Sequence, residues 1–399
     1  MGSEMCIRDR GKAAWRFTTG ARVDSPPTVY QGRAIFGSHD GYVYNVRASD
    51  GALAWRLRAA REDRRIAANG QLESASPALG SVLVRDGVVY ATAGRSSYLD
   101  GGLRFYGLEP HTGRKVVETV LDSRHADGSQ TLDDQAVDGF LNDILSSDGE
   151  RLFMRHQILD KSGKPQTGRI SHLHSPDGYL SSNTTSRLLW TYAPLYTSPH
   201  QGAFYDIRLS RVLFPSGRIL VEDDDTIYGF GQNHYAAMAK KRTDTGGEFA
   251  LFACPKRSDV PLDETAREYR KLALAGKHQV RFKWWKKLPI QVWAMVKTED
   301  ILFVAGPRGD ASVSQDALDG KAPGLLLAVS PADGAVLAET TLPSMPVWDG
   351  IAAAGNNLYI TLANGSAARL RSPAKNTPPT FTREKHPSDG FNATRQQQE

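Results

Sequence analysis

The sequence predicts an all-β fold, a β-propeller of about seven or eight four-stranded blades at roughly 40 to 50 residues per blade. Three observations predict it. Short apolar runs alternate with Asp-Gly or Thr-Gly turns, which is typical of β-hairpins because type I′ turns need positive φ. The pattern recurs along the chain, with Trp15 and Trp55 one blade length apart. The 37 Gly and 21 Pro suit a protein with many turns.

The clearest copies of the repeat lie at residues 26–60, 79–118 and 300–340. In each copy two apolar strands are followed by a turn with glycine and then by a closing strand. Weaker copies lie at 218–230 and 357–370. Because one blade cannot bury both of its apolar faces, each copy needs neighbouring blades to form a core.

A single position in the closing strand distinguishes the three clear copies. Trp55 follows the turn at Gly51, whereas Val117 and Ala338 take the place of the tryptophan in the other two. The opening segment around Trp15 resembles the closing strand of a blade whose earlier strands are missing. We therefore expect the propeller to be truncated at its N-terminal end.

The two ends of the chain differ from the repeats. Residues 1–10 include Met5 to Arg10, which resembles the translation of a sequencing adapter, and we leave them out of the predicted fold. The propeller is assigned to residues 11–371. Residues 372–399 are rich in Pro, Asn and Gln and are predicted to be a disordered tail. Residues 263–275 have a composition that favours a short helical insert.

Composition excludes several classes of protein. The net charge of +5 over 399 residues is modest and spread out, so nucleic-acid binding is not expected. No apolar run is long enough for a transmembrane helix. Cys6 lies in the adapter-like segment, which leaves Cys254 alone and excludes a disulfide framework in the rest of the chain.

The repeat unit, with its Gly turn and a following Trp such as Trp55, resembles the pyrroloquinoline-quinone (PQQ) enzyme repeat. That repeat occurs in quinoprotein alcohol dehydrogenases and in the non-catalytic lipoprotein propeller of the barrel-assembly machinery. The segments 63–74 and 93–102 further resemble large uncharacterised exported proteins of planctomycete-type bacteria. The resemblance implies a bacterial protein that is periplasmic or otherwise exported.

The resemblance implies different chemistry for catalytic and non-catalytic members. A catalytic member is expected to carry an adjacent Cys pair, a calcium site and an Asp base over the quinone, and this sequence has no Cys pair. We therefore expect no cofactor and favour a non-catalytic scaffold that binds a protein or glycan partner. A dehydrogenase that uses PQQ with calcium and a carbohydrate-active propeller enzyme stay as alternatives.

A polar cluster in two loops of neighbouring blades is the candidate ligand site. Loops at one end of a propeller surround its channel, so these side chains could converge on an anionic or polyhydroxylated ligand. The alternative is that the arginines pair with Glu62, Asp63 or Glu73 in a solvated turn. The candidate residues are Arg64, Arg65, Gln71, Glu73, Arg95, Ser96, Ser97 and Asp100.

Three other motifs favour structural roles. His172 and His174 share one face of a strand, but without a third ligand they are interpreted as surface histidines, and no metal is expected. The acidic run 222–225 lacks the spacing of a calcium loop and is predicted to be a turn. In the segment 283–287, tryptophans are predicted to pack between blades while lysines protect a strand edge.

Overall fold

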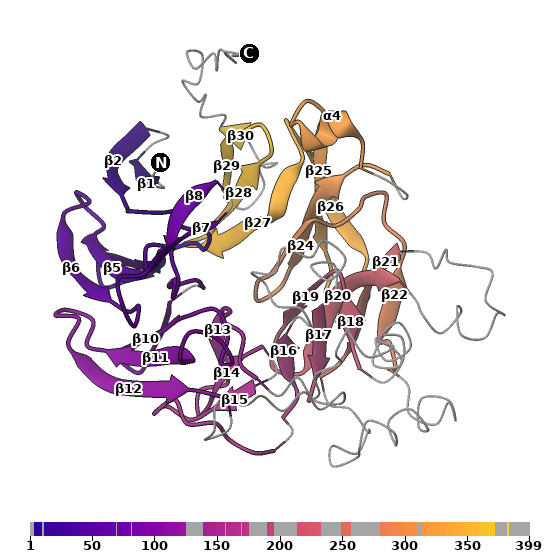
Figure 1. Ribbon diagram of the computed structural model, residues 1–399. Coiled ribbons are helices and arrows are strands. Elements are labelled where there is room, and N and C mark those ends of the chain that lie inside the picture. The colour runs from indigo at the N-terminus through magenta and orange to yellow at the C-terminus, as the bar shows by residue number, and fades with distance from the viewer. Residues whose placement is uncertain are drawn as a thin grey trace, which may run out of the picture. The chain divides into compact units, whose positions relative to one another are not determined.

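The computed structural model describes residues 4–9, 12–68, 70–80, 82–124, 139–155, 157–168, 170–174, 190–194, 214–232, 249–256, 280–309, 313–371 and 381–382. The chain divides into two compact units. Unit 1 holds most residues from Ala14 to Lys283, and unit 2 holds Trp284–Glu399 with two short earlier segments. Figure 1 shows antiparallel sheets throughout the described residues. The prediction of an all-β propeller fold is confirmed.

Unit 1 contains two regular four-stranded blades. The first consists of β3 (Thr28–Tyr30), β4 (Arg33–Gly37), β5 (Tyr42–Arg47) and β6 (Leu53–Arg58), in this order across the sheet. The second consists of β9 (Leu83–Arg85), β10 (Val88–Ala93), β11 (Leu103–Leu108) and β12 (Lys115–Leu121). They coincide with the predicted copies at 26–60 and 79–118 (Figure 1).

Shorter sheets follow in unit 1. A two-stranded hairpin, β7 (Arg65–Ala68) and β8 (Gln71–Ser74), connects the two regular blades. After them, β13 (Leu145–Ser147), β14 (Leu152–Met154) and β15 (Gln157–Leu159) form one sheet, and β16 (His172–His174), β17 (Trp190–Ala193) and β18 (Ser216–Gly217) form the next. They are followed by β19 (Ile219–Glu222), β20 (Thr226–Gln232) and β21 (Phe249–Pro255). The predicted repeat at 218–230 is the β19–β20 hairpin.

Unit 2 begins with β22 (Trp284–Lys286) and contains two further blades. One is β23 (Ala294–Lys297), β24 (Leu302–Pro307), β25 (Gly324–Val329) and β26 (Val336–Leu342), with the short helix α4 (Gln315–Leu318) between β24 and β25. The other is β27 (Pro346–Ala354), β28 (Asn357–Leu362), β29 (Ala367–Arg371) and β30 (Phe381–Thr382). The copies at 300–340 and 357–370 are thus confirmed as strands.

Tryptophan docking recurs at the closing strands. The indole Nε1 of Trp15 donates a hydrogen bond to Ala48 O at 2.9 Å, and that of Trp55 donates to Pro110 O at 2.8 Å. In unit 2, Trp284 donates to Pro331 O at 2.9 Å. Each indole also covers the glycine of the turn that it reaches, and these glycines are Gly51, Gly113 and Gly334, all at positive φ.

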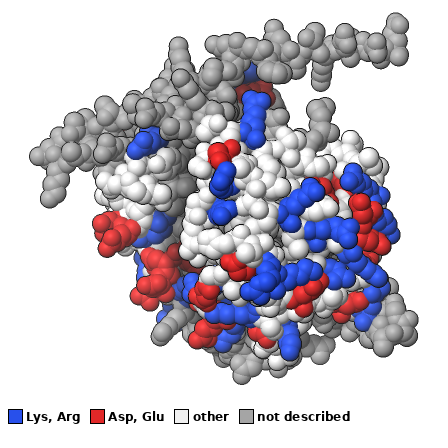
Figure 2. All heavy atoms as spheres, turned by 90° about the vertical axis from the view of Figure 1, so that its left-hand side faces the viewer, with Lys and Arg blue, Asp and Glu red and all other residues white. Residues whose placement is uncertain are grey.

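The outer strands carry exposed charge. Arg47 pairs with Asp50 at 2.7 Å, and Glu118 on β12 pairs with both Lys115 and Arg104. Figure 2 shows Lys and Arg mixed with Asp and Glu across this side of the molecule. Charged side chains along outer strands discourage edge-to-edge pairing with strands of other molecules. Because both signs are mixed, they create no large electrostatic field of one sign.

Several predictions from the ends and motifs can be compared with the structure. The acidic run forms the predicted turn, since Asp223 Oδ1 accepts hydrogen bonds from the backbone N–H groups of Asp225 and Thr226. Trp284 is buried, as predicted for the segment 283–287. Of the adapter-like residues, the described ones form β1 (Glu4–Asp9), which pairs with β2 (Lys12–Thr18). The predicted helix at 263–275 lies outside the described residues, as does the tail apart from β30.

Candidate functional site

The predicted polar cluster lies on two segments of unit 1, the β7–β8 hairpin and the loop between β10 and β11. The hairpin reaches the loop through Arg95 and through Arg64, which hydrogen-bonds to Asp100. The structure therefore brings most of the predicted residues into one region. It also adds partners from earlier in the chain that the sequence pattern did not indicate.

Glu73 is the centre of this region. Its side chain is only 1% exposed and is surrounded by three positively charged or protonatable groups. His39 Nδ1 lies 3.0 Å from Glu73 Oε2, Arg95 Nη2 lies 3.2 Å from the same oxygen, and Arg22 Nε lies 3.4 Å from Oε1. Asp24 Oδ2 lies 2.8 Å from His39 Nε2 and completes the group. We call Arg22, Asp24, His39, Glu73 and Arg95 the Glu73 cluster.

The environment of Glu73 favours the carboxylate. Burial alone would raise its pKa. The hydrogen bond and charge of His39, the hydrogen bond of Arg95 and the charge of Arg22 together outweigh burial, so that the pKa of Glu73 lies below its usual value. A buried carboxylate with this many partners holds the elements that carry those partners together.

The cluster has a clear structural consequence for the hairpin. Glu73 and Ile66 are paired across β7 and β8, and Ala67 and Leu72 form the next pair. Because successive residues of a strand point to opposite faces, anchoring Glu73 inward turns Leu72 outward. Leu72 is 62% exposed, and Leu99, on the linked loop, is 50% exposed.

The remaining predicted residues are mostly engaged within the protein. Arg65 lies 3.7 Å from Asp63, and Arg64 lies 3.5 Å from Glu62 in addition to its bond with Asp100. Ser96 Oγ accepts from Tyr98 N. Ser97 Oγ contacts Ser123 Oγ and accepts from Phe140 N, both at 2.8 Å. Gln71 is half-buried on β8. These contacts shape the loops.

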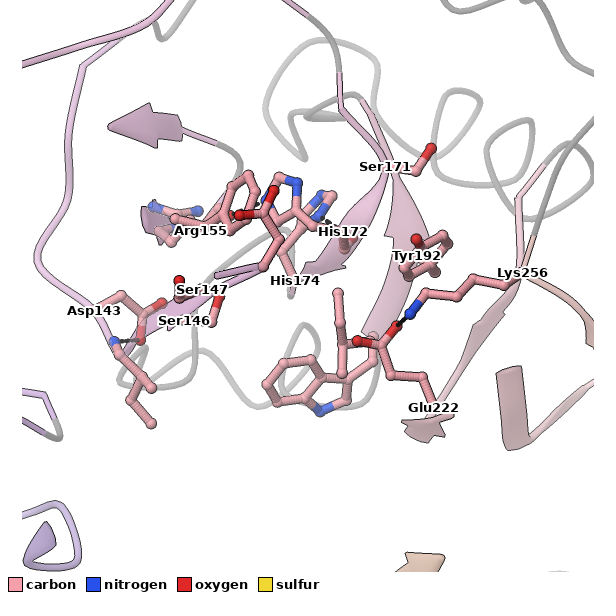
Figure 3. Close-up of a pocket in the computed structure, with 15 residues that line it drawn as sticks. Asp143, Ser146, Ser147, Arg155, Ser171, His172, His174, Tyr192, Glu222 and Lys256 are labelled. Atoms are coloured by element: carbon pink, nitrogen blue, oxygen red, sulfur yellow. Dashed lines mark hydrogen bonds and ion pairs between the residues drawn. The ribbon is translucent and has the colours of Figure 1, made fainter. Parts of the chain in front are cut away.

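A second polar region is a cavity of about 430 Å³ in unit 1 (Figure 3). It is lined by β13, β16 and β19, the first strands of three successive sheets, together with β17 and the residues after β21. Its walls combine aromatic, cationic and anionic groups, among them Asp143, Arg155, His172, His174, Trp190, Tyr192, Glu222 and Lys256.

Charges on one wall of the cavity are paired. Lys256 Nζ lies 3.2 Å from Glu222 and 5.5 Å from the centre of the Tyr192 ring. Burial and, less strongly, the charge of Glu222 raise the pKa of Tyr192 to about 12, so its hydroxyl keeps its proton at neutral pH. This wall can donate and accept hydrogen bonds without a strong net charge.

The histidines also line this cavity, and the interpretation that they lie on the surface is wrong. His172 and His174 are 8% and 3% exposed, and both line the cavity. They share one face of β16, as their spacing predicts, with ring centres 4.9 Å apart. His172 Nε2 lies 2.7 Å from Arg155 O and its Nδ1 lies 2.8 Å from Ile170 O. Each nitrogen of the His172 ring therefore faces a backbone carbonyl oxygen.

In the part of the chain that the structure describes, no three His, Cys, Asp or Glu side chains gather into a possible metal site. The two cysteines, Cys6 and Cys254, are far apart in sequence. The residues present therefore do not match the Cys pair expected of a catalytic quinoprotein.

Among the described residues, no helix is long and apolar enough to cross a membrane.

Comparison with known proteins bears on the repeat. Residues 3–155 match the family model described as outer membrane protein assembly factor BamB. This range includes both regular blades of unit 1 and the Glu73 cluster. Over residues 3–155 the predicted relationship to the PQQ-repeat propellers is thus confirmed. No curated protein is significantly similar to the chain.

Solved structures with a similar fold are distant in sequence. BamB from Moraxella catarrhalis is 14% identical, with 91% of this chain and 87% of that chain covered and a TM-score of 0.45. A europium-containing methanol dehydrogenase is 12% identical, with coverage of 90% and 76% and a TM-score of 0.41. The computationally designed Ika8 protein is 11% identical, with coverage of 86% and 94% and a TM-score of 0.33. At these TM-scores, none of the three assigns a function.

Proposed function

We propose that this protein is a non-catalytic, exported propeller scaffold that binds a protein partner through the β7–β8 hairpin and the linked β10–β11 loop. The observation that carries the proposal is the anchoring of this hairpin by the buried Glu73, which leaves Leu72 62% exposed. A large apolar side chain that a rigid element holds in an exposed position lowers the ordering cost of a protein contact.

The residues around Leu72 also suit the binding of a protein partner. Leu99 is exposed on the linked loop, and Arg61 and Arg64 lie between the two segments, both bonded to Asp100. Apolar side chains next to arginine are typical of protein interfaces. The family matched by residues 3–155 is named for an assembly factor, and assembly requires contacts with other proteins.

The test is site-specific photo-crosslinking in the native host. A photoreactive phenylalanine analogue is placed at Leu72, at Leu99 and, as a control, at Val116, which is 46% exposed on the outer strand β12. We expect one discrete protein adduct from positions 72 and 99 and none from 116. We also expect Leu99→Asp to remove the adduct formed at position 72. Equal adducts at all three positions, or none at 72 and 99, would contradict the proposal.

A glycan is a second candidate ligand, favoured by the cavity of Figure 3. Trp190 and Tyr192 offer aromatic surfaces, and Arg155, Asp143 and Glu222 offer charged hydrogen-bonding groups around them. This combination suits a sugar, whose apolar ring faces and hydroxyl groups need both kinds of partner. Binding of soluble oligosaccharides, measured by calorimetry, should be lost in Trp190→Ala and kept in Leu72→Ala. Equal binding by both variants would place the sugar elsewhere.

A further inference from the structure

One register position differs between equivalent blades of the two units. In the first blade of unit 1, Trp55 on β6 lies opposite Asn45 on β5, directly before a register shift. In unit 2, Ala338 on β26 lies opposite Ala328 on β25, again directly before the shift. Ala338 therefore stands where the first blade has its docking tryptophan.

Both members of the pair are changed in unit 2. Trp55 Nε1 and Asn45 Nδ2 each donate a hydrogen bond of 2.8 Å to Pro110 O in the next blade. Ala328 and Ala338 have no polar side-chain atoms and can make neither bond. The device that clamps one blade to the next in unit 1 is thus absent from this position in unit 2.

A cavity of about 590 Å³ occupies the corresponding place in unit 2, and Ala328 and Ala338 line it. Its other apolar walls include Phe303, Leu326, Leu358 and Leu370. Their register equivalents in unit 1 all belong to the buried cluster around Trp55, and they are Ile35, Val43, Val89 and Leu108. Unit 2 therefore keeps apolar residues at these wall positions, but it has no indole in the place that Trp55 fills in unit 1.

The second blade of unit 1 shows that losing the tryptophan does not by itself open a cavity. Val117 holds the same position there, opposite Gly107. The turn after β15, which contains Ser162 and Gly163, lies close to this blade. Thr119 Oγ1 on β12 donates a hydrogen bond to Ser162 O at 2.7 Å. A Cβ atom on Gly163 would lie 2.2 Å from the Phe105 ring, so this ring occupies the gap. Unit 2 retains the space instead.

We propose that this cavity of unit 2 binds a small planar aromatic molecule whose ring system takes the place of the missing indole. The volume lies within the range of small-molecule sites. The cavity is open to solvent beside Ala338 and Asn356, and its Leu and Phe side chains can pack against an aromatic ring. Thr340 and Asn356, which also line the cavity, suit a polar substituent on the ring. This site is separate from the proposed partner surface of unit 1, and its test does not depend on that surface.

The probe is indole, titrated into the full-length protein and followed by saturation-transfer NMR and by thermal melting. We expect saturable binding by the wild type and a higher melting temperature with indole. Ala338→Trp fills the cavity covalently and should weaken indole binding at least tenfold. Leu337→Trp adds the same side chain at the adjacent exposed position and should leave indole binding unchanged. Ala338→Leu, a smaller filling variant, should weaken binding as well if Ala338→Trp does not fold.

Three outcomes would overturn the proposal. The first is the absence of saturable indole binding by the wild type, and the second is equal binding by wild type and the Ala338 variants. The third concerns the source of the ring, which N-acetyl-tryptophanamide probes as a mimic of a tryptophan within a peptide. If this amide binds at least tenfold more tightly than indole, the cavity receives a side chain from a polypeptide and not a small molecule.

Discussion

Trp55 of one blade lies flat against Gly113 of the next, so closely that a Cβ atom at Gly113 would fall 2.7 Å from Trp55 Cδ2. Two requirements meet at this glycine. Its φ of +71° is a conformation that other residues rarely adopt, and its bare Cα lets the indole reach the turn and donate to Pro110 O. Gly51 with Trp15 and Gly334 with Trp284 repeat the relationship.

Gly113→Ala should therefore lower the free energy of unfolding by more than backbone strain alone. Gly87 is the matched control, since its φ is +75° and a Cβ atom there would have nothing within 4 Å. We expect backbone strain to lower the free energy of unfolding by about 1–2 kcal/mol in Gly87→Ala. In Gly113→Ala, overpacking against Trp55 should lower it by about 1–3 kcal/mol more. Equal losses in urea unfolding would show that the indole does not depend on this close approach.

Glu73→Gln should destabilise the protein at neutral pH by about 1.5–3 kcal/mol, because charged hydrogen bonds to His39 and Arg95 are lost. The pKa of Glu73 is lower in the folded protein, so its contribution is full above the unfolded pKa of about 4.3 and disappears as the pH falls through the folded pKa.

Denaturant unfolding from pH 7 to pH 3 measures this dependence. The difference between wild type and Glu73→Gln should be constant above about pH 5 and shrink at lower pH. Glu150→Gln changes a side chain that is 83% exposed and should give curves parallel to the wild type. A difference between wild type and Glu73→Gln that grows on acidification would contradict the assigned direction of the pKa shift.

Cys254 should report global unfolding. It is fully buried on β21, and burial raises the pKa of its thiol to about 12, which keeps the reactive thiolate scarce. In a Cys6→Ser variant, a disulfide reagent should label Cys254 only as fast as the protein unfolds. Rapid labelling under native conditions would show that this sheet opens locally.

Addition of PQQ and calcium should leave the melting temperature unchanged and should give no dye reduction with primary alcohols. The physical reason is that the sequence has no adjacent Cys pair and that no three His, Cys, Asp or Glu side chains gather among the residues described. A ligand that binds only the folded state raises its stability according to its concentration and affinity. A melting temperature that rises with the concentrations of added PQQ and calcium would favour the dehydrogenase alternative.

Much of the blade architecture follows from local sequence. Asp-Gly and Thr-Gly turns between apolar runs place the strands of residues 26–60, 79–118 and 300–340, because hairpin turns and period-2 alternation are properties of neighbouring residues. The same alternation places His172 and His174 on one face. The spacing of Trp15 and Trp55 likewise indicates the blade repeat.

Tertiary structure decided what surrounds these residues. The partners of Glu73 come from segments as distant as Arg22 and His39. His172 likewise packs against Phe153 and contacts Arg155 O, both from an earlier part of the chain. Ala338 reads in the sequence as a degenerate copy of Trp55, yet only packing shows that the space is retained there and closed beside Val117. Turn and strand preferences are local, whereas burial, charge pairing and cavities are set by contacts between residues far apart in sequence.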